Sequence, residues 1–293
     1  MITILTPTYN REYILHEAYE SLLAQTDKDF EWVVIDDGST DGTQEKVLAW
    51  QKESPFPIVY ERKENGGKHR ALNVGSRLAK AEYTLILDSD DSLTENAVAT
   101  VKGWIEEIKD LDGFAGVAGL KGYKGRNQAV GGTCGDKNFI DATNLERKKY
   151  KLMGDKAEVY KTELLRKYPF PEFEGEKFIR EGAVWDRIAK DGYKIRWYNE
   201  IIYECDYLED GLTKNLDKAF FAKNIQGYAY CTKLYLETHG WLASLLQIGR
   251  YASIAKINGA TKEEICKTLG INKGKLTLGK ALYGIWAKVK KGV

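Results

Sequence analysis

The segment that decides the fold spans residues 83–91 and reads YTLILDSDD. Its first five residues form a short apolar run, typical of a buried strand, and four acidic or hydroxyl side chains follow directly: Asp88, Ser89, Asp90 and Asp91. Carboxylates gathered at a strand end repel one another and resist desolvation, so a divalent cation usually neutralises them, and oxygen ligands favour Mg²⁺ or Mn²⁺. The alternative is a solvated acidic turn that caps the next helix.

The sequence around this segment alternates strand and helix signals with short connections. Strands are expected at 2–5, 32–35, 58–60, 83–87 and 114–117, and helices at 13–24, 44–52, 70–79 and 95–108. This alternation predicts an α/β protein with a doubly wound, mostly parallel sheet. Three polar clusters, 7–11, 36–41 and 88–91, each follow a strand directly. Because such sheets bind ligands beyond the carboxyl ends of their strands, we expect the clusters to line one crevice.

The second half of the chain has a different pattern. Residues 121–155 are a Gly-rich, polar excursion, which we interpret as loops and short strands. Further strands are expected at 157–160, 194–198 and 201–205, with helices near 162 and over 183–190. Beyond Asn215 the chain is predicted to be helical almost to its end. We therefore expect a ligand-binding domain over 1–215 and a C-terminal helical extension over 216–293.

Composition excludes some classes of protein. The 293 residues carry 44 Lys and Arg against 43 Asp and Glu, so no global positive field attracts nucleic acid. The first residues turn polar too quickly for a signal peptide, and no apolar run reaches the length of a membrane span, so a cytoplasmic protein is expected. The four cysteines are widely spaced, which predicts free thiols.

Four motifs, taken in order, resemble those of the family 2 glycosyltransferases of GT-A fold. They are TPTYNR at 6–11, VIDDGSTDGT at 34–43, NGG at 65–67 with the helical residues Ala71, Asn73 and Gly75, and LDSDD at 87–91. The resemblance is close over the first hundred residues and looser to about Asn215. It implies a GT-A nucleotide-sugar-binding and catalytic domain, acting in the synthesis of a bacterial surface polysaccharide or another glycan.

The motif residues suit the parts of a nucleotide. Tyr9 offers an aromatic face for a pyrimidine, and Asp37 offers an anionic acceptor for the uracil N3–H, a donor that cytosine lacks, so the pair predicts UDP. The alternative is that Asp37 only caps its turn. Lys68 opens the helix after Gly67, where cations and backbone amides suit a phosphate or ribose edge. The other predicted nucleotide-binding residues are Pro7, Thr8, Arg11, Asp88 and Ser89.

The resemblance makes residues 88–90 a DxD motif. It implies that Asp90 coordinates the metal bridging the diphosphate, while Asp88 binds the ribose or a metal-bound water. The implied cofactor is Mn²⁺ or Mg²⁺, which would neutralise the charge on departing UDP.

Sugar transfer also needs a base for the acceptor hydroxyl. Family members carry an acidic pair where a helix opens after the sheet, and here Glu181 occupies that place while Gly182 replaces the second acid. Glu181 is therefore the predicted catalytic base, with Asp186 and Glu176 as alternatives. A single base with no adjacent nucleophile predicts inversion, giving a β-linked product from an α-linked donor.

Weaker candidates for an acceptor site or a closing segment are Trp185, Asp186, Asp210 and Thr213. Trp185 could stack on an acceptor sugar, although a core position is the alternative. Asp210 and Thr213 lie in a stretch that resembles a segment closing over the donor in relatives, with turn formation as the alternative.

The end of the chain suggests an amphipathic helix. Over 278–289, Leu278, Leu282, Ile285, Trp286 and Val289 share one helical face, opposite Lys280, Lys288 and Lys291. This layout is typical of a helix lying in a membrane surface, which would suit a lipid-linked acceptor; the alternative is packing of the same face on the preceding helices.

Together these observations predict an inverting, metal-dependent glycosyltransferase using a UDP-sugar donor and a glycan or lipid-linked acceptor, cytoplasmic or at the inner face of the plasma membrane. Two alternatives are a sugar-nucleotide nucleotidyltransferase and a non-catalytic nucleotide- or glycan-binding protein on the same fold. A dinucleotide-binding dehydrogenase is disfavoured, since no G-x-G-x-x-G follows the first strand.

Overall fold

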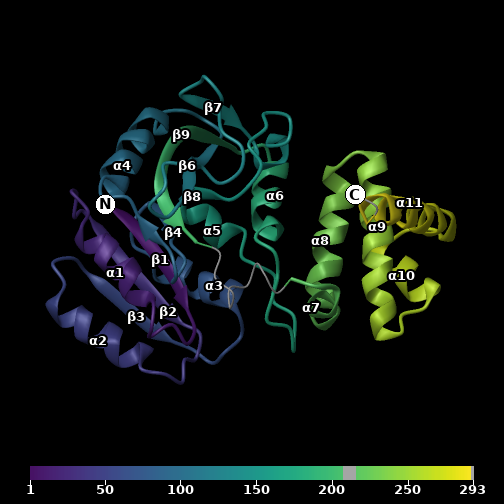
Figure 1. Cartoon of the computed structure of the whole chain (residues 1–293), viewed down its shortest axis with the longest axis horizontal. Helices are drawn as coiled ribbons and strands as arrows, with labels where there is room; N and C mark the ends of the chain where they lie inside the picture. Colours follow the sequence, from purple (N-terminus) through teal and green to yellow (C-terminus); the bar gives the residue numbers. More distant parts are fainter. Residues whose placement is uncertain (207–215, 292–293) are drawn as a thin grey trace. The chain divides into compact units, whose positions relative to one another are not determined.

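The computed structural model describes residues 1–206 and 216–291 (Figure 1). It divides into two compact units, Met1–Phe170 with Ile188–Asp206, and Pro171–Arg187 with Tyr207–Val293. The predicted domain boundary at residue 215 falls in the stretch 207–215, outside the described residues.

The first unit is built on one sheet. Within the described residues its strands are β1 (Ile2–Thr8), β2 (Phe30–Asp36), β3 (Ile58–Arg62), β4 (Tyr83–Ile86), β5 (Ser92–Leu93), β6 (Phe114–Tyr123), β7 (Phe139–Ala142), β8 (Lys156–Lys161) and β9 (Lys194–Cys205). They lie in the order β3-β2-β1-β4-β8-β6-β9-β5, with β7 paired to β9. β1 is parallel to β2 and β4, β2 to β3, and β6 to β9, while β8 is antiparallel to β4 and β6. Six strands therefore share one direction, which confirms a doubly wound, mostly parallel sheet.

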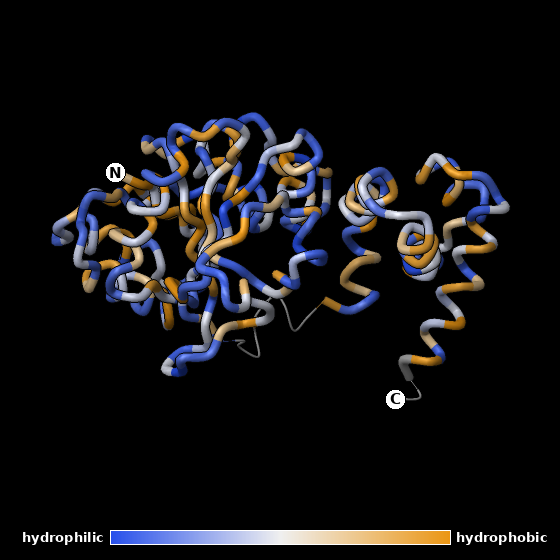
Figure 2. Tube along the Cα trace, turned by 90° about the horizontal axis from the view of Figure 1, so that it is seen from above, coloured by the Kyte–Doolittle hydropathy of each residue, from blue (hydrophilic) through white to orange (hydrophobic). Residues whose placement is uncertain are grey.

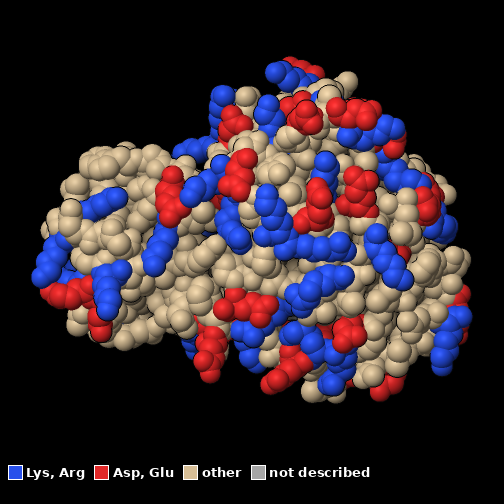
Figure 3. All heavy atoms as spheres, turned by 180° about the vertical axis from the view of Figure 1, so that it is seen from behind, with Lys and Arg blue, Asp and Glu red and all other residues tan. Residues whose placement is uncertain are grey.

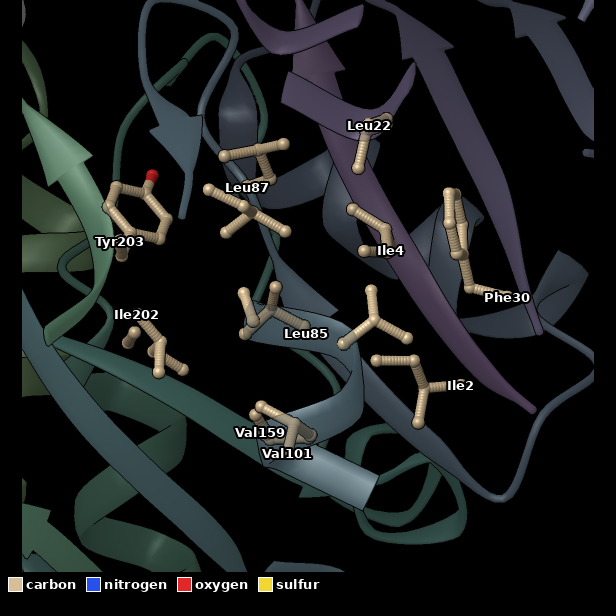
Figure 4. Packing of buried hydrophobic residues seen from close by; sticks show 14 of the residues in the cluster. Ile2, Ile4, Leu22, Phe30, Leu85, Leu87, Val101, Val159, Ile202 and Tyr203 are labelled. Carbon is tan, nitrogen blue, oxygen red and sulfur yellow. The ribbon is translucent and has the colours of Figure 1, made fainter. Parts of the chain in front are cut away.

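Helices cover both faces of this sheet. One face packs on α1 (Leu15–Leu23), α2 (Thr43–Glu53) and α4 (Ala97–Ile108), whose apolar side chains form a common core with alternate residues of β1 such as Ile2 and Ile4 (Figure 4). The other face carries α3 (Lys68–Leu78) and α5 (Thr162–Lys167). α3 lies so close to β1 that a Cβ on Gly75 would be 2.1 Å from Leu5 Cδ1.

One strand prediction was wrong in its bounds. Residues 194–205 form the single strand β9, rather than two strands separated at Asn199 and Glu200. Asn199 and Glu200 are polar, which predicted a turn. In the structure the strand continues through them and its register against β6 shifts, because Ala118 pairs with Trp197 and Leu120 with Ile201. The excursion after β6 contains β7 and the 3-10 helix η1 (Asn144–Glu146), in line with the predicted loops and short strands.

The second unit is helical, as expected for the end of the chain. Its helices are α7 (Lys218–Lys223), α8 (Ile225–Thr238), α9 (Trp241–Ala255), the 3-10 helix η3 (Lys256–Asn258), α10 (Lys262–Leu269) and α11 (Lys273–Lys291). α6 (Gly182–Lys190) begins in this unit. The helices share an apolar core that includes Phe221, Leu245 and Ile248.

The last helix packs on α9 through glycines. A Cβ on Gly249 would lie 2.2 Å from the carbonyl oxygen of Gly279, and a Cβ on Gly279 would lie 2.8 Å from that of Leu245. Leu276 beside this crossing is 1% exposed. The side of α11 that packs on α9 is therefore the side of Leu276 and Gly279. Of the predicted stripe, Leu282 is partly buried against the core of this unit, while Leu278, Ile285, Trp286 and Val289 are exposed.

The cysteines in the described ranges are free, and three of the four are buried. None of the described helices has both the length and the apolar character needed to cross a bilayer.

Candidate active site

Two loops at the carboxyl edge of the sheet hold each other in place. Asn10, in a left-handed conformation after β1, donates its N–H to Ser39 Oγ (2.9 Å) and accepts the N–H of Thr40 (2.8 Å) on its side-chain oxygen. Asp41 accepts the hydroxyl of Thr43 (2.6 Å) and the N–H of Glu12 (3.0 Å). The loops after β1 and β2 are thus one rigid wall, on which Tyr9 stands 46% exposed.

Asp37 binds the loop before α3. Its Oδ1 accepts from Lys63 Nζ (2.6 Å) and the N–H of Gly66 (2.9 Å), and its Oδ2 from Asn65 Nδ2 (3.1 Å) and the N–H of Gly67 (2.6 Å). Four donors fill the acceptor sites of the carboxylate. For Asp37 to accept a uracil N3–H, a donor has to leave, and the Lys63 ammonium is the one on a flexible stem. The amides of Gly66 and Gly67, which directly precede α3, are thus committed to Asp37.

Gly67 ends this loop at a φ of +99°, and Gly38 after Asp37 has a φ of +83°. A Cβ on Gly38 would lie 2.9 Å from the backbone nitrogen of Asn65. Both positions favour glycine, because the left-handed region is strained for other residues and the loop backbone approaches closely. This explains why the two loops carry DG and NGG.

The acidic turn 88–91 is held by a buried tyrosine from β9. Tyr203 accepts the N–H of Asp88 on its hydroxyl oxygen (2.9 Å) and donates its hydroxyl to Asp91 Oδ2 (2.7 Å). Its ring lies at the edge of the core cluster in Figure 4. The turn closes with the N–H of Asp91 donating to the carbonyl of Asp88 (3.2 Å).

Three cations surround the carboxylates of this turn. Lys68 Nζ is 2.5 Å from Asp88 Oδ1, and Arg11 Nη2 is 3.8 Å from Asp90 Oδ2. Lys121 on β6 reaches both Asp88 (3.6 Å) and Asp91 (3.7 Å), and its ammonium lies 3.9 Å from the centre of the Tyr203 ring. These cations come from the loop after β1, the first residue of α3 and the strand β6, so segments far apart in the sequence converge on the turn.

The pKa values of the three carboxylates in this turn are shifted in different directions. Burial acts to raise the pKa of Asp88, but the ammonium groups of Lys68 and Lys121 outweigh it, so the pKa falls below its usual range. Burial, and then the charge of Asp88, raise the pKa of Asp90. The same two causes raise the pKa of Asp91. Arg11, the backbone N–H of Asp90 and Lys68 favour the ionised form of Asp90, but they do not outweigh burial and the charge of Asp88.

These residues could hold a divalent cation together with water and substrate phosphates. Among the described residues, no group of three His, Cys, Asp or Glu side chains is arranged to bind a metal by itself. Mg²⁺ and similar ions, however, are commonly held by one or two carboxylates together with water and substrate phosphates. The oxygen donors of Asp88 and Asp90, and the burial of the Asp90 charge beside that of Asp88, suit a metal that arrives with a diphosphate.

Other predicted nucleotide residues lie at the same strand ends. Pro7 and Thr8 end β1, where Thr8 is 3% exposed and its Oγ1 has no hydrogen-bond partner among the described residues. A buried hydroxyl without a partner is rare unless a ligand or water completes it. Ser89 is 7% exposed inside the acidic turn.

The predicted base and acceptor residues lie in the second unit. Glu181 directly precedes α6, and its carbonyl accepts the N–H of Val184 (2.9 Å). Trp185 is 5% exposed, which favours the packing role over an open stacking face. Burial, and then the charge of Asp186, raise the pKa of Tyr235 on α8, so Asp186 faces that helix. Asp210 and Thr213 lie outside the described residues.

Glu176 has a structural role. Its carboxylate is 6% exposed and accepts the N–H groups of Gln226 (2.7 Å) and Gly227 (2.8 Å) at the start of α8. Both oxygens are committed to this helix end, which weakens Glu176 as an alternative base.

Sequence reasoning missed Lys121 and Tyr203. Both lie in strands whose residues look like ordinary sheet positions. The pairing of β9 with β5 brings Tyr203 to the acidic turn, and the pairing of β6 with β9 places Lys121 beside Tyr203. The one available signal was Lys121 itself, a charge inside the otherwise apolar run of β6, where most positions are buried.

The sheet order defines an α/β protein of GT-A type, with an acidic cluster at the carboxyl edge of the sheet. Comparison with known protein families identifies the family: the family model described as "Glycosyl transferase family 2" matches residues 3–156. The chain therefore belongs to family 2 of the glycosyl transferases, and it is a transferase.

Three similar proteins illustrate this membership. "Glycosyltransferase GlyG" of Streptococcus pneumoniae is 37% identical over 112 residues, which cover 38% of this chain and 37% of that protein. The chain thus matches little more than a third of this relative's length. The crystal structure of S. aureus TarS 1-349 in complex with UDP has a TM-score of 0.64 at 18% identity, covering 98% of this chain and 91% of that one. The mannosyltransferase PcManGT from Pyrobaculum calidifontis, in complex with GDP-Man and Mn²⁺, has a TM-score of 0.55 at 18% identity, covering 98% and 87%. These two likenesses show the fold.

Proposed function

We propose that this protein transfers a sugar, with inversion, from a UDP-sugar to a glycan or lipid-linked acceptor in the synthesis of a bacterial surface polysaccharide. The observation that carries the proposal is the acidic turn 88–91, pinned by Tyr203 and ringed by Arg11, Lys68 and Lys121 at the carboxyl edge of the sheet. Family membership makes the sugar-nucleotide nucleotidyltransferase the weaker alternative.

The donor's nucleotide would lie along the ends of β1 and β2. Tyr9 is exposed enough for its ring to stack on a uracil, and Asp37 would accept the N3–H once Lys63 leaves its carboxylate. Thr8 Oγ1 is a further polar atom in this wall for the nucleotide to engage. The TarS structure, by its title, holds UDP, and PcManGT holds GDP-Man, so the base itself has to be tested.

The diphosphate would lie at the acidic turn. Asp90, with Asp88 beside it, would hold Mn²⁺ or Mg²⁺, and the bound ion would supply Lewis-acid stabilisation of the charge on the departing UDP. Lys68 and Arg11 currently neutralise carboxylates. Because an ion at Asp90 offsets that acidic charge, both side chains become free to face phosphate oxygens, where guanidinium and ammonium donors bind well.

Chemistry at the sugar needs one proton acceptor. The acceptor oxygen attacks C1, the bond from C1 to the diphosphate oxygen breaks, and the hydroxyl proton passes to Glu181. Glu181 directly precedes α6, and a carboxylate is the kind of group that accepts such a proton. A lipid-linked acceptor would place this reaction at the inner face of the plasma membrane.

A donor-hydrolysis screen tests the proposal. The protein is incubated without acceptor and with UDP-, GDP- or CDP-sugars, in the presence of Mn²⁺ or a chelator, since many transferases slowly pass the sugar to water. We expect UDP release from a UDP-sugar only with metal. Asp90→Ala should abolish the metal dependence of UDP affinity, while Asp110→Ala, at an exposed position of the same unit, should keep it.

Two results would count against parts of the proposal. Equal UDP affinity with and without metal in the unmutated protein rejects the metal site. Tight UDP binding without turnover of any UDP-sugar, with or without acceptor glycans, leaves a nucleotide-binding protein on this fold.

A further inference from the structure

The last helix leaves an apolar stripe uncovered. Leu278, Ile285 and Val289 are 41%, 63% and 65% exposed, although they share one side of α11. Trp286, at the edge of this stripe, is 43% exposed and stacks on Tyr283 with ring centres 5.7 Å apart. Figure 2 shows hydrophobic residues recurring along this helix. Within the described part of the chain, the opposite side of α11, at Leu276 and Gly279, is the one that packs on α9.

The surroundings of the stripe are strongly basic. Residues 256–291 contain nine lysines, two glutamates and no arginine or aspartate, while the whole chain has a net charge of +1. The lysines gather in space as well: burial, and then the charges of Lys256 and Lys262, lower the pKa of Lys280. Figure 3 shows Lys and Arg atoms with few acidic atoms on the C-terminal helices. This end of the protein therefore carries a local positive field that the rest of the chain lacks.

Apolar and basic side chains on one helix point to a single kind of partner. A soluble polyanion would engage the lysines but leave Ile285 and Val289 in water. A second copy of the chain would cover the stripe but bring like-charged lysines together. An anionic lipid surface satisfies both, because the stripe enters the acyl boundary while the lysines meet the headgroups.

We propose that the stripe Leu278, Ile285, Trp286 and Val289, together with lysines elsewhere on α11 such as Lys288, docks the second unit on an anionic bilayer, α11 lying in the membrane plane. The choice of membrane rests on the proposed function, since a lipid-linked acceptor would be there. The docking surface on the protein is inferred from the exposure and charge of α11 alone. Nucleotide binding is carried by residues of the first unit, so the two proposals can fail separately.

Vesicle co-sedimentation of the full chain tests the docking surface. Vesicles of phosphatidylcholine with about a third phosphatidylglycerol are compared with pure phosphatidylcholine, at low and high salt. We expect binding to the anionic vesicles alone, weakened about tenfold or more as screening increases. Ile285→Glu should weaken binding at least about tenfold, since it removes an inserted apolar side chain and adds a repelled charge. Lys288→Glu should act in the same direction.

Leu111→Glu is the matched control, because Leu111 is 41% exposed like Leu278 but lies in the first unit. It should leave vesicle binding unchanged, whereas Leu278→Glu weakens it. Thermal melting and UDP calorimetry on every variant separate docking from folding and from nucleotide binding. The proposal is overturned if vesicle binding does not depend on lipid charge, or if the Ile285→Glu variant binds as well as the unmutated protein. It is also overturned by a dimer, seen by ultracentrifugation without vesicle binding, that Ile285→Glu dissociates.

Discussion

Removing the hydroxyl of Tyr203 should loosen the acidic turn without disturbing the core around its ring. In Tyr203→Phe the N–H of Asp88 loses its acceptor and Asp91 Oδ2 loses its donor, in a region where Tyr203 is fully buried. A neutral hydrogen bond contributes about 0.5–1.5 kcal/mol and one to a charged group about 1.5–3 kcal/mol. The two losses together predict a destabilisation of about 2–4 kcal/mol.

Tyr83→Phe provides the comparison. Tyr83 is 3% exposed in the same sheet, and its hydroxyl has no hydrogen-bond partner among the described residues. Its removal should change stability by less than about 0.5 kcal/mol or increase it, since a buried unpaired hydroxyl is costly. Urea unfolding followed by circular dichroism measures both variants, and UDP calorimetry with Mn²⁺ should show weaker binding for Tyr203→Phe alone. Equal effects of the two substitutions would refute the assigned role of Tyr203.

Three further outcomes are expected. Asp37→Asn should reduce the preference for UDP over CDP by about 1–3 kcal/mol in calorimetry, and equal binding of both nucleotides by the unmutated protein rules out this reading of the base. Glu181→Gln should lower transfer by about 10²–10⁴ with UDP affinity retained, while Glu174→Gln on the same exposed loop stays active; normal turnover in Glu181→Gln shifts the assignment to Asp186. Lys156 is 3% exposed, and burial, then Arg147, lower its pKa from 10.5 to about 8. The unfolded chain therefore binds more protons between pH 8 and 10.5, so stability rises with pH across that window, by up to about 1.4 kcal/mol per pH unit. Urea unfolding of Lys156→Met should lack this rise, and a rise that persists assigns it to other groups.

Much of the fold was predictable, because its signals are local. The run 83–87 and the acidic residues behind it are contiguous, and alternation along the first 118 residues predicted the doubly wound sheet that the structure confirms. The features that the sequence did not predict depend on contacts between residues far apart in the chain. Tyr203 reaches Asp91 across 112 residues of sequence, through the order of strands in the sheet. Likewise, α11 packs through Gly279, and glycine gives no hydrophobic signal, so the pattern could not say which side of that helix is covered.

The pairing of β9 with β6 also has a consequence for the order in which the protein matures during synthesis. The strands β1 to β4 and the carboxylates of the acidic turn have all been synthesised once about a hundred residues are made, and domains begin to fold as they emerge from the ribosome. Tyr203 follows a further hundred residues later, so the growing chain holds the charged turn before it holds the tyrosine that fixes it. Until then the turn lacks the hydroxyl of Tyr203, and the cations already made are Arg11, Lys68 and later Lys121. Translation of residues 92–203 is therefore the interval in which the acidic turn exists without the tyrosine that fixes it, and its length is set by the distance along the sequence from the turn to β9.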